Sequence, residues 1–146
     1  MKYFLDANIC LDLLDRTRPT SGNAVAWYME HKDDEDMEFI FSGDFITTIF
    51  YILNQRRKIP ADEVVAAIDA LCEEINPCYI EHSDYLHAKA AFHKGLSGDF
   101  EDLMILASAK RAGCDMFLTN DTEILSVGMF EGMRIEKIEN IYKKGI

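Results

Sequence analysis

The stretch Lys2-Tyr3-Phe4-Leu5-Asp6-Ala7-Asn8-Ile9-Cys10-Leu11-Asp12-Leu13-Leu14 decides how this chain folds. A short apolar run ends at Asp6, and within three residues apolar side chains resume at the spacing of a helix. This pattern predicts a buried strand that delivers Asp6 to the edge of a sheet, followed by a helix. Open α/β sheets bind their ligands at that edge, so Asp6 is the first candidate for a functional side chain.

The chain has 146 residues, and its 49% of hydrophobic residues are enough to fill the core of one domain. We therefore expect a single domain over residues 1–146. The sequence starts directly on the predicted strand, without a basic segment, a long apolar run or a cleavage site, which favours a cytoplasmic protein with no membrane span. The four cysteines lack C-x-x-C spacing, so we expect free thiols.

The formal net charge of −11 argues against broad electrostatic attraction to nucleic acid. It does not exclude a metal-dependent nuclease, because bound cations would invert the field of an acidic site. Part of the acidic excess lies in residues 33–36, where we expect a solvated loop. Residues 56–58 and 110–111 are the compact basic groups. They are typical of helix C-termini, and the alternative is that they hold a phosphate backbone.

Strand-like and helix-like segments alternate along the chain. We expect strands over residues 38–42, 78–81 and 116–119 and around 134–135. We expect helices around residues 24–29 and over residues 60–75, 83–96, 100–112 and 120–127. The apolar run over residues 45–53 could be a strand, but its length and its basic end favour a buried helix. In the helix over residues 83–96, capped by Ser83, we expect Leu86, Ala90 and Phe92 to face inward.

This alternation implies βαβ crossovers. It therefore predicts an α/β fold with a largely parallel sheet that helices cover on both faces.

Carboxylates from three parts of the chain can meet at one edge of such a sheet. Asp6 and Asp121 each follow a predicted strand, and the carboxyl ends of parallel strands share one edge. Asp99 and Asp102 are three residues apart, so they share one face of a first helical turn, whereas Glu101 is expected to point elsewhere. Crowded carboxylates repel each other unless a cation lies among them. Oxygen ligands alone favour Mg²⁺ or Mn²⁺ over zinc.

Each of these acids also has a purely structural explanation. Asp99 could cap its helix, with Asp102 stabilising the first turn through the helix dipole. Asn120 or Asp121 could cap the next short helix. For Asp6 this explanation is weaker, because an acid at the mouth of a buried strand is costly unless it is paired or liganded.

Other catalytic chemistry finds no support in the sequence. Asp12 and Asp15 are expected on the polar face of the first helix. The histidines lack the i, i+4 spacing of a helical metal pair and are expected at the surface or the edge of the core. They are His31, His82, His87 and His93. No G-x-S-x-G motif, Walker loop or dinucleotide glycine pattern is present.

Four segments, in this order, resemble the PIN domain, and most closely the PIN ribonucleases of the VapC toxin kind. They are Asp6-Ala7-Asn8 after the first strand, Ser42 with residues 47–53, residues 99–103, and Leu118-Thr119-Asn120-Asp121. The resemblance spans residues 1 to about 125. It implies a three-layer α/β/α sandwich, hydrolysis of RNA phosphodiesters and four acids around one or two Mg²⁺ or Mn²⁺ ions. It also implies frequent dimerisation and, for toxin members, inhibition by a cognate antitoxin protein.

Carried over by position, Asp6, Asp102 and Asp121 match the first, third and fourth acids of the family. Asp99 matches an extra acid found in a subset of members. The chain departs from the family at the second acid, a glutamate in most members, where Thr48 stands.

Thr48 cannot supply a charge, so Asp99 would have to substitute, the cation would have to bind through water, or the site would be weakened. Asp44 lies near the same end of the helix but is too early in it to be preferred. Asn8 and Thr119 are expected to orient the ligands by hydrogen bonding. In the implied reaction, water attacks a phosphate in line, the 3′-oxygen leaves, and a 5′-phosphate remains.

Two alternatives stay open. The first is a protein of the same fold that binds or regulates without catalysis, which the uncharged Thr48 and the acidic surface favour. The second is a phosphohydrolase with an aspartyl nucleophile. That chemistry needs a second acid two residues after the first, where this chain has Asn8.

Overall fold

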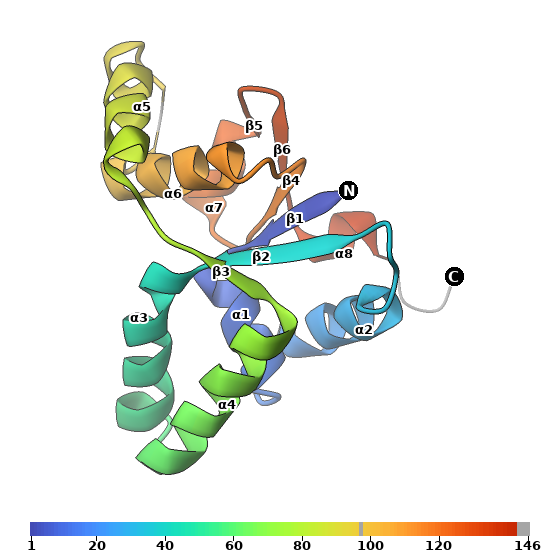
Figure 1. The fold of residues 1–146 in the computed structure, drawn as a ribbon. Coiled ribbons are helices and arrows are strands. Elements are labelled where there is room, and N and C mark those ends of the chain that lie inside the picture. Colours follow the sequence, from blue (N-terminus) through green and yellow to red (C-terminus); the bar gives the residue numbers. More distant parts are fainter. Residues whose placement is uncertain (97, 143–146) are drawn as a thin grey trace.

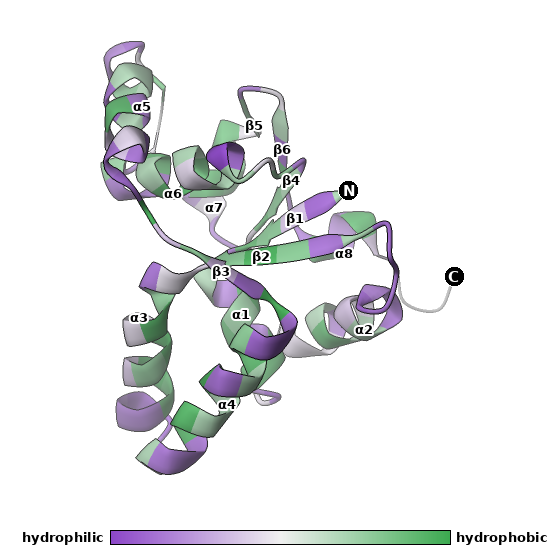
Figure 2. Ribbon diagram, viewed as in Figure 1, coloured by the Kyte–Doolittle hydropathy of each residue, from purple (hydrophilic) through white to green (hydrophobic). Residues whose placement is uncertain are grey.

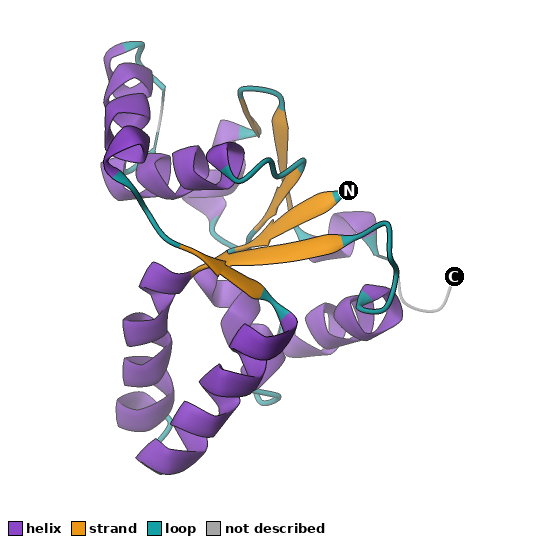
Figure 3. Ribbon diagram, in the orientation of Figure 1, coloured by secondary structure: helices purple, strands orange, loops and turns teal. Residues whose placement is uncertain are grey.

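The computed structural model describes residues 1–96 and 98–142 and is built on a sheet of six strands (Figures 1 and 3). The strand order is β3-β2-β1-β4-β6-β5. Neighbouring strands are parallel except at the β5 edge, where β5 and β6 form an antiparallel pair. The strands are β1 (Lys2–Leu5), β2 (Glu38–Ser42), β3 (Asn76–Cys78), β4 (Met116–Leu118), β5 (Met129–Phe130) and β6 (Met133–Glu136).

Helices cover both faces of the sheet, which gives the three-layer α/β/α sandwich that the sequence predicts (Figure 1). The helices on one face are α1 (Ala7–Leu14), α2 (Ser21–His31), α3 (Ile46–Tyr51), the π-helical turn η2 (Ile52–Arg56), α4 (Ala61–Glu74) and α8 (Ile138–Ile141). The helices on the other face are α5 (His82–His93), α6 (Phe100–Arg111) and α7 (Thr122–Val127). A 3₁₀ turn, η1 (Gly43–Phe45), joins β2 to α3.

The central strand β1 is buried on both faces. Leu5 belongs to the core half beneath α1 to α4, whereas Phe4 belongs to the other half and stacks on Phe117 at a ring distance of 5.0 Å. Successive strand side chains point to opposite faces, so a strand covered on both sides must be apolar throughout. Figure 2 shows this as a mostly green sheet between helices with mixed colouring. Asp6, the first polar residue after this strand, therefore comes at its end.

The apolar run after Asp44 forms a helix, as its length and basic end predict. α3 continues directly into η2, and Ile49 and Leu53, four residues apart, are buried on the same face. Exposed basic residues follow at positions 56–58. The alternative of a strand in this segment is wrong.

The predicted strand over residues 78–81 is wrong in its position, because β3 occupies Asn76–Cys78. The following helix also begins earlier than Ser83. A capping box starts α5 at His82: the Glu81 side chain accepts from the backbone N–H of Asp84, and the Asp84 carboxylate accepts from the backbone N–H of Glu81 at 2.8 Å.

The inward face of α5 also differs from the prediction. Leu86 is 46% exposed and Phe92 is 53% exposed, and Ala90 is exposed as well, so the predicted inward face is wrong. The buried residues are Asp84, Ala88 and Ala91, at positions i, i+4 and i+7. Asp84 is buried because Arg111 of α6 pairs with it, with Nε 2.9 Å from Oδ1. This ion pair selects the face of α5 that meets α6.

The C-terminal part contains elements that the sequence did not indicate. The strand expected around residues 134–135 is β6, and β5 precedes it across a tight turn in which Glu131 and Gly132 have φ angles of 47° and 86°. The helix α8 packs its Ile138 into the core half beneath α1 to α4. This end of the chain thus completes the sheet edge and part of one helical layer.

The cysteines are free, as expected, and burial raises the pKa of the Cys10 and Cys114 thiols. In the described part of the chain, every helix is too short or too polar to cross a lipid bilayer.

Candidate functional site

Asp6 and Asp121 lie at the carboxyl ends of neighbouring parallel strands. The backbone N–H of Asp6 donates to the carbonyl of Leu118, the last residue of β4, at 3.0 Å. Asp121 follows three residues later and caps α7. The structure therefore brings these two acids together at the edge of the sheet where open α/β folds bind ligands.

Asp6 is buried, yet it is well supplied with hydrogen bonds. Its Oδ1 accepts from the backbone N–H of Ala7 at 2.8 Å, and its Oδ2 accepts from Thr119 Oγ1 at 2.7 Å and from Asn8 Nδ2 at 3.1 Å. Burial raises the pKa of the Asp6 carboxyl, the bonds from Thr119 and Ala7 lower it, and the charge of Asp121 raises it. The side chain is thus held in one orientation by donors that favour its charged form.

The first turn of α6 closes an open cleft of about 420 Å³ around these residues. Asp102 and Glu101 both line this cleft. Asp99 stands at the start of α6, exposed to solvent, and its side chain makes no capping hydrogen bond. The residues that line the cleft are Asp6, Ala7, Asn8, Leu11, Asp44, Phe45, Thr48, Ile52, Ile80, Glu101, Asp102, Ile105, Asp121 and Ile124.

The carboxylates of the cleft repel one another. Burial, together with the charges of Asp121, Asp6 and Asp99, raises the pKa of Asp102 to about 6. Asp99 therefore acts on Asp102 through its charge, although it does not line the cleft. A cation among these groups would relieve the repulsion and return Asp102 to its charged form.

Asp121 caps a helix and also lines the cleft. Its Oδ1 caps α7 by accepting from the backbone N–H groups of Glu123 at 2.8 Å and Ile124 at 3.2 Å. Its Oδ2 makes no hydrogen bond to any described residue and belongs to a side chain that lines the cleft. The structural explanation for Asp121 is therefore correct but incomplete.

Thr48 and Asp44 come from the segment after β2, and both line the cleft. Asp44 Oδ2 accepts from Ser42 Oγ at 3.1 Å and from the backbone N–H of Ile80 at 2.8 Å, which fixes the carboxylate at the rim. The sequence alone does not favour Asp44, because it comes early in the predicted helix. The available signal was its place two residues after a predicted strand, the same kind of place that Asp6 and Asp121 occupy.

Asn8 and Thr119 tie the two strand ends together. The buried Thr119 hydroxyl donates to Asp6 and accepts from Asn8 Nδ2 at 3.2 Å and from the backbone N–H of Asp121 at 3.0 Å. Asn8 Oδ1 accepts from the backbone N–H of Asn120 at 2.9 Å. Neither side chain is charged, and each orients the acids around it, as we expected from the sequence.

Asp12 is not on the polar face of α1, so that prediction is wrong. Its side chain is fully buried: Oδ1 accepts from Arg18 Nε and from Thr20 Oγ1, each at 2.7 Å, and Oδ2 accepts from Asn120 Nδ2 at 2.9 Å. Through Asn120, Asp12 anchors the turn that carries Asp121. Asp15 is also buried, at 8% exposure, and pairs with Arg57.

The donor chemistry of the cleft suits a hard cation. The charged side chains are carboxylates, which Mg²⁺ and Mn²⁺ prefer. Among residues 1–96 and 98–142, no three Asp, Glu, His or Cys side chains are arranged to hold one ion together. Mg²⁺ usually keeps several waters and takes only one or two carboxylates, so an ion held by Asp6 and Asp102 with water is consistent with this spacing.

Comparison with solved structures shows that the fold is shared. VapBC2 from Rickettsia felis, solved bound to a DNA fragment from its promoter, matches with a TM-score of 0.67 at 14% identity, covering 94% of this chain and 98% of that one. VapC20 from Mycobacterium tuberculosis, described as a sarcin-ricin loop cleaving toxin, also matches with a TM-score of 0.67, at 18% identity over 90% of this chain and 98% of that one.

Comparison of sequences leads to the family. Ribonuclease VapC1 from Aquifex aeolicus (strain VF5) is 28% identical over 132 residues, which cover 86% of this chain and 85% of that protein. The model of the PIN domain family matches residues 3–128, which include every acid that lines the cleft. This chain therefore belongs to the PIN domain family.

Proposed function

We propose that this protein is a metal-dependent endoribonuclease that hydrolyses RNA phosphodiester bonds and acts as the toxin of a toxin–antitoxin pair. The observation that carries the proposal is the acidic cleft, which Asp6, Asp102 and Asp121 line together. Membership of the PIN family and the similarity to Ribonuclease VapC1 support the same reaction class.

Mg²⁺ or Mn²⁺ is the proposed cofactor, with Asp6 and Asp102 as its principal ligands and Asp121 completing the set directly or through water. Asp99 adds negative charge from outside the cleft. When bound, the ion would neutralise charge on the phosphate and lower the pKa of the attacking water. Asn8 and Thr119 hold the Asp6 carboxylate in place through their hydrogen bonds.

We further propose that Asp44 and Glu101 replace part of the charge that Thr48 lacks. Both carboxylates line the same cleft as Asp6, and Asp44 is fixed by its bonds to Ser42 and Ile80. Charge at the rim would help to retain a cation that is held partly through water.

The proposed protein partner is an antitoxin, as in the complexes of VapBC proteins that share the fold. The family resemblance also favours a homodimer. A PIN protein that binds without cutting is the second candidate function, and the uncharged Thr48 is the observation that favours it.

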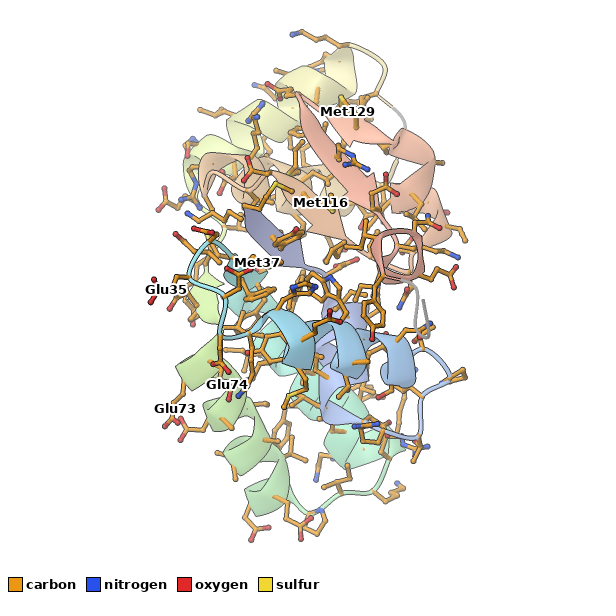
Figure 4. All side chains as sticks on the ribbon, turned by 90° about the vertical axis from the view of Figure 1, so that its right-hand side faces the viewer. Glu35, Met37, Glu73, Glu74, Met116 and Met129 are labelled. Carbon is orange, nitrogen blue, oxygen red and sulfur yellow. The ribbon has the colours of Figure 1, made fainter. Side chains whose placement is uncertain are left out.

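Cleavage of a single-stranded and a structured RNA, in the presence of Mg²⁺ or Mn²⁺, tests the proposed reaction. We expect the wild type to cut, and Asp6→Asn and Asp102→Asn to lose at least a hundredfold in rate, because each removes a charged ligand. Glu73→Gln is a matched control. It makes the same acid-to-amide change at an exposed site at the end of α4, beside Glu74 and away from β5, as Figure 4 shows.

The products should carry 5′-phosphates. Wild-type protein that cuts neither RNA with either metal would overturn the ribonuclease proposal in favour of the binding protein. Equal rates for the wild type and the two cleft variants would trace the activity to a contaminant.

A further inference from the structure

Five basic side chains gather where α1 and η2 end. They are Arg16, Arg18, Arg56, Arg57 and Lys58, and we call them the basic patch. Arg57 joins its two segments: its Nε lies 3.1 Å from Asp15 Oδ2, and its Nη2 donates to Thr17. The whole chain has 15 lysines and arginines against 26 acids, so a third of its basic residues belong to this one patch.

The acids that touch the basic patch are buried under it. Asp12 and Asp15 have side-chain exposures of 1% and 8%, whereas their partners Arg18 and Arg57 are 30% and 46% exposed. The surface that solvent meets is therefore cationic, and the ion pairs fix both guanidinium groups in place. The patch ends before α4, whose first turn carries Asp62 and Glu63.

The helical segments that line the acidic cleft, α1 and α3 with η2, end at the basic patch. Thr48 and Ile52 line the cleft, and Arg56 ends the helical segment that carries them. On α1, Leu11 lines the cleft, and Asp15, four residues later, holds Arg57. Arg56 is the eighth residue after Thr48, which corresponds to roughly 12 Å along the axis at the rise of an α-helix.

An exposed aromatic ring stands beside the patch. Tyr51 is 52% exposed, and the guanidinium carbon of Arg56 lies 5.7 Å from the centre of its ring. Arginines and aromatic rings on a cationic surface are the groups on which bases of single-stranded nucleic acids stack.

We propose that the basic patch binds the backbone of a single-stranded RNA whose scissile phosphate lies in the acidic cleft. This inference rests on the proposed function, which makes RNA the substrate. The acidic remainder of the surface repels a polyanion, so the patch determines the direction in which the strand leaves the cleft. The protein therefore binds a part of the RNA strand that lies beyond the cleaved bond.

The test compares two double variants that each remove two exposed positive charges. Arg16→Ala/Arg56→Ala removes patch residues that do not pair with the buried acids. Lys89→Ala/Lys94→Ala is the matched control, with Lys89 on α5 and Lys94 at its C-cap, and this helix covers the opposite face of the sheet. Both are made in an Asp102→Asn background, so that the RNA is bound and not cut. The melting temperature of each variant confirms that it folds.

Fluorescence anisotropy then measures the affinity for a labelled, unstructured RNA of about 12 nucleotides at several salt concentrations. We expect the patch variant to bind about tenfold more weakly at low salt, with the slope of log affinity against log salt reduced by about 1.4, the value for two lost phosphate contacts to a single strand. The control should bind within twofold of its background.

Affinities of both double variants that remain those of the Asp102→Asn background would overturn the inference. Equal losses in both would also overturn it, because the effect would then be one of net charge alone. Neither result depends on cleavage. Failure of the ribonuclease proposal would instead be seen with the wild type in the cleavage assay.

Discussion

Thr48 is an uncharged residue in a cleft that five acids line. It lines the cleft where the family resemblance leads us to expect a glutamate, and Asp44 lies one helical turn before it. We predict that Thr48→Glu lowers the Mg²⁺ concentration needed for half-maximal cleavage about tenfold, because a carboxylate in this position adds a charged ligand.

Thr47→Glu is the control, since Thr47 is exposed on the same helix and does not line the cleft. Without metal, Thr48→Glu should also unfold at a lower temperature, because it adds one more acid to groups that already repel each other. If Thr48→Glu folds normally but needs the same Mg²⁺ concentration for half-maximal cleavage as the wild type, Thr48 is not at the position of the missing ligand.

At the level of single residues, the sequence predicts the acids that follow strands better than those that are set by tertiary contacts. Asp6 and Asp121 could be placed because an acid ends an apolar run in each case. Asp12 could not be placed, because its partner Asn120 is 108 residues away in the sequence. The residues around Asp12 on α1 also have the pattern of an ordinary amphipathic helix, which predicts an exposed acid.

At the level of elements, one buried ion pair decides how α5 meets α6. Asp84 is 1% exposed and forms several hydrogen bonds with Arg111, whose pKa rises because of that carboxylate. Apolar spacing cannot predict this, since the residue that turns inward is an acid. The large apolar side chains of α5 face solvent instead.

We predict that Arg111→Ala destabilises the protein by about 3–5 kcal/mol, because it leaves the buried charge of Asp84 unpaired. The double variant Arg111→Ala/Asp84→Ala should be more stable than Arg111→Ala, since it removes that charge. Arg134→Ala breaks an exposed pair with Glu136 and should cost no more than about 1 kcal/mol. Urea unfolding measures all three, and similar losses for Arg111→Ala and Arg134→Ala would contradict the role given to the buried pair.

At the level of the whole molecule, the layered fold could be predicted because strands and helices alternate and β1 is apolar on both faces. The edges of the sheet could not. β3 is a three-residue edge strand that contains Pro77, and β5 has only two residues, so neither is long enough for a periodic pattern. The position of such short strands depends on the neighbours to which they bond.

The burial of Asp102 among other acids affects the stability of the metal-free protein. The pKa of Asp102 rises from its ordinary value of 3.8 to about 6 on folding. Between these two values the folded protein keeps a proton that the unfolded chain has released, so the free energy of unfolding falls as the pH increases. Above about pH 6 this loss is complete, and below about pH 4 it is absent.

We therefore predict that Asp102→Asn, with EDTA present, melts several degrees above the wild type at pH 7.5 and at nearly the same temperature at pH 4. Adding Mn²⁺ at pH 7.5 should reverse the order, because the ion stabilises only the protein that retains its ligand. Glu73→Gln, outside the cleft, should follow the wild type in both conditions. A metal-free Asp102→Asn protein that is no more stable than the wild type at pH 7.5 would show that the acids of the cleft do not oppose folding. In that case the cleft acids would not destabilise the metal-free protein, and a bound ion would have no repulsion between them to relieve.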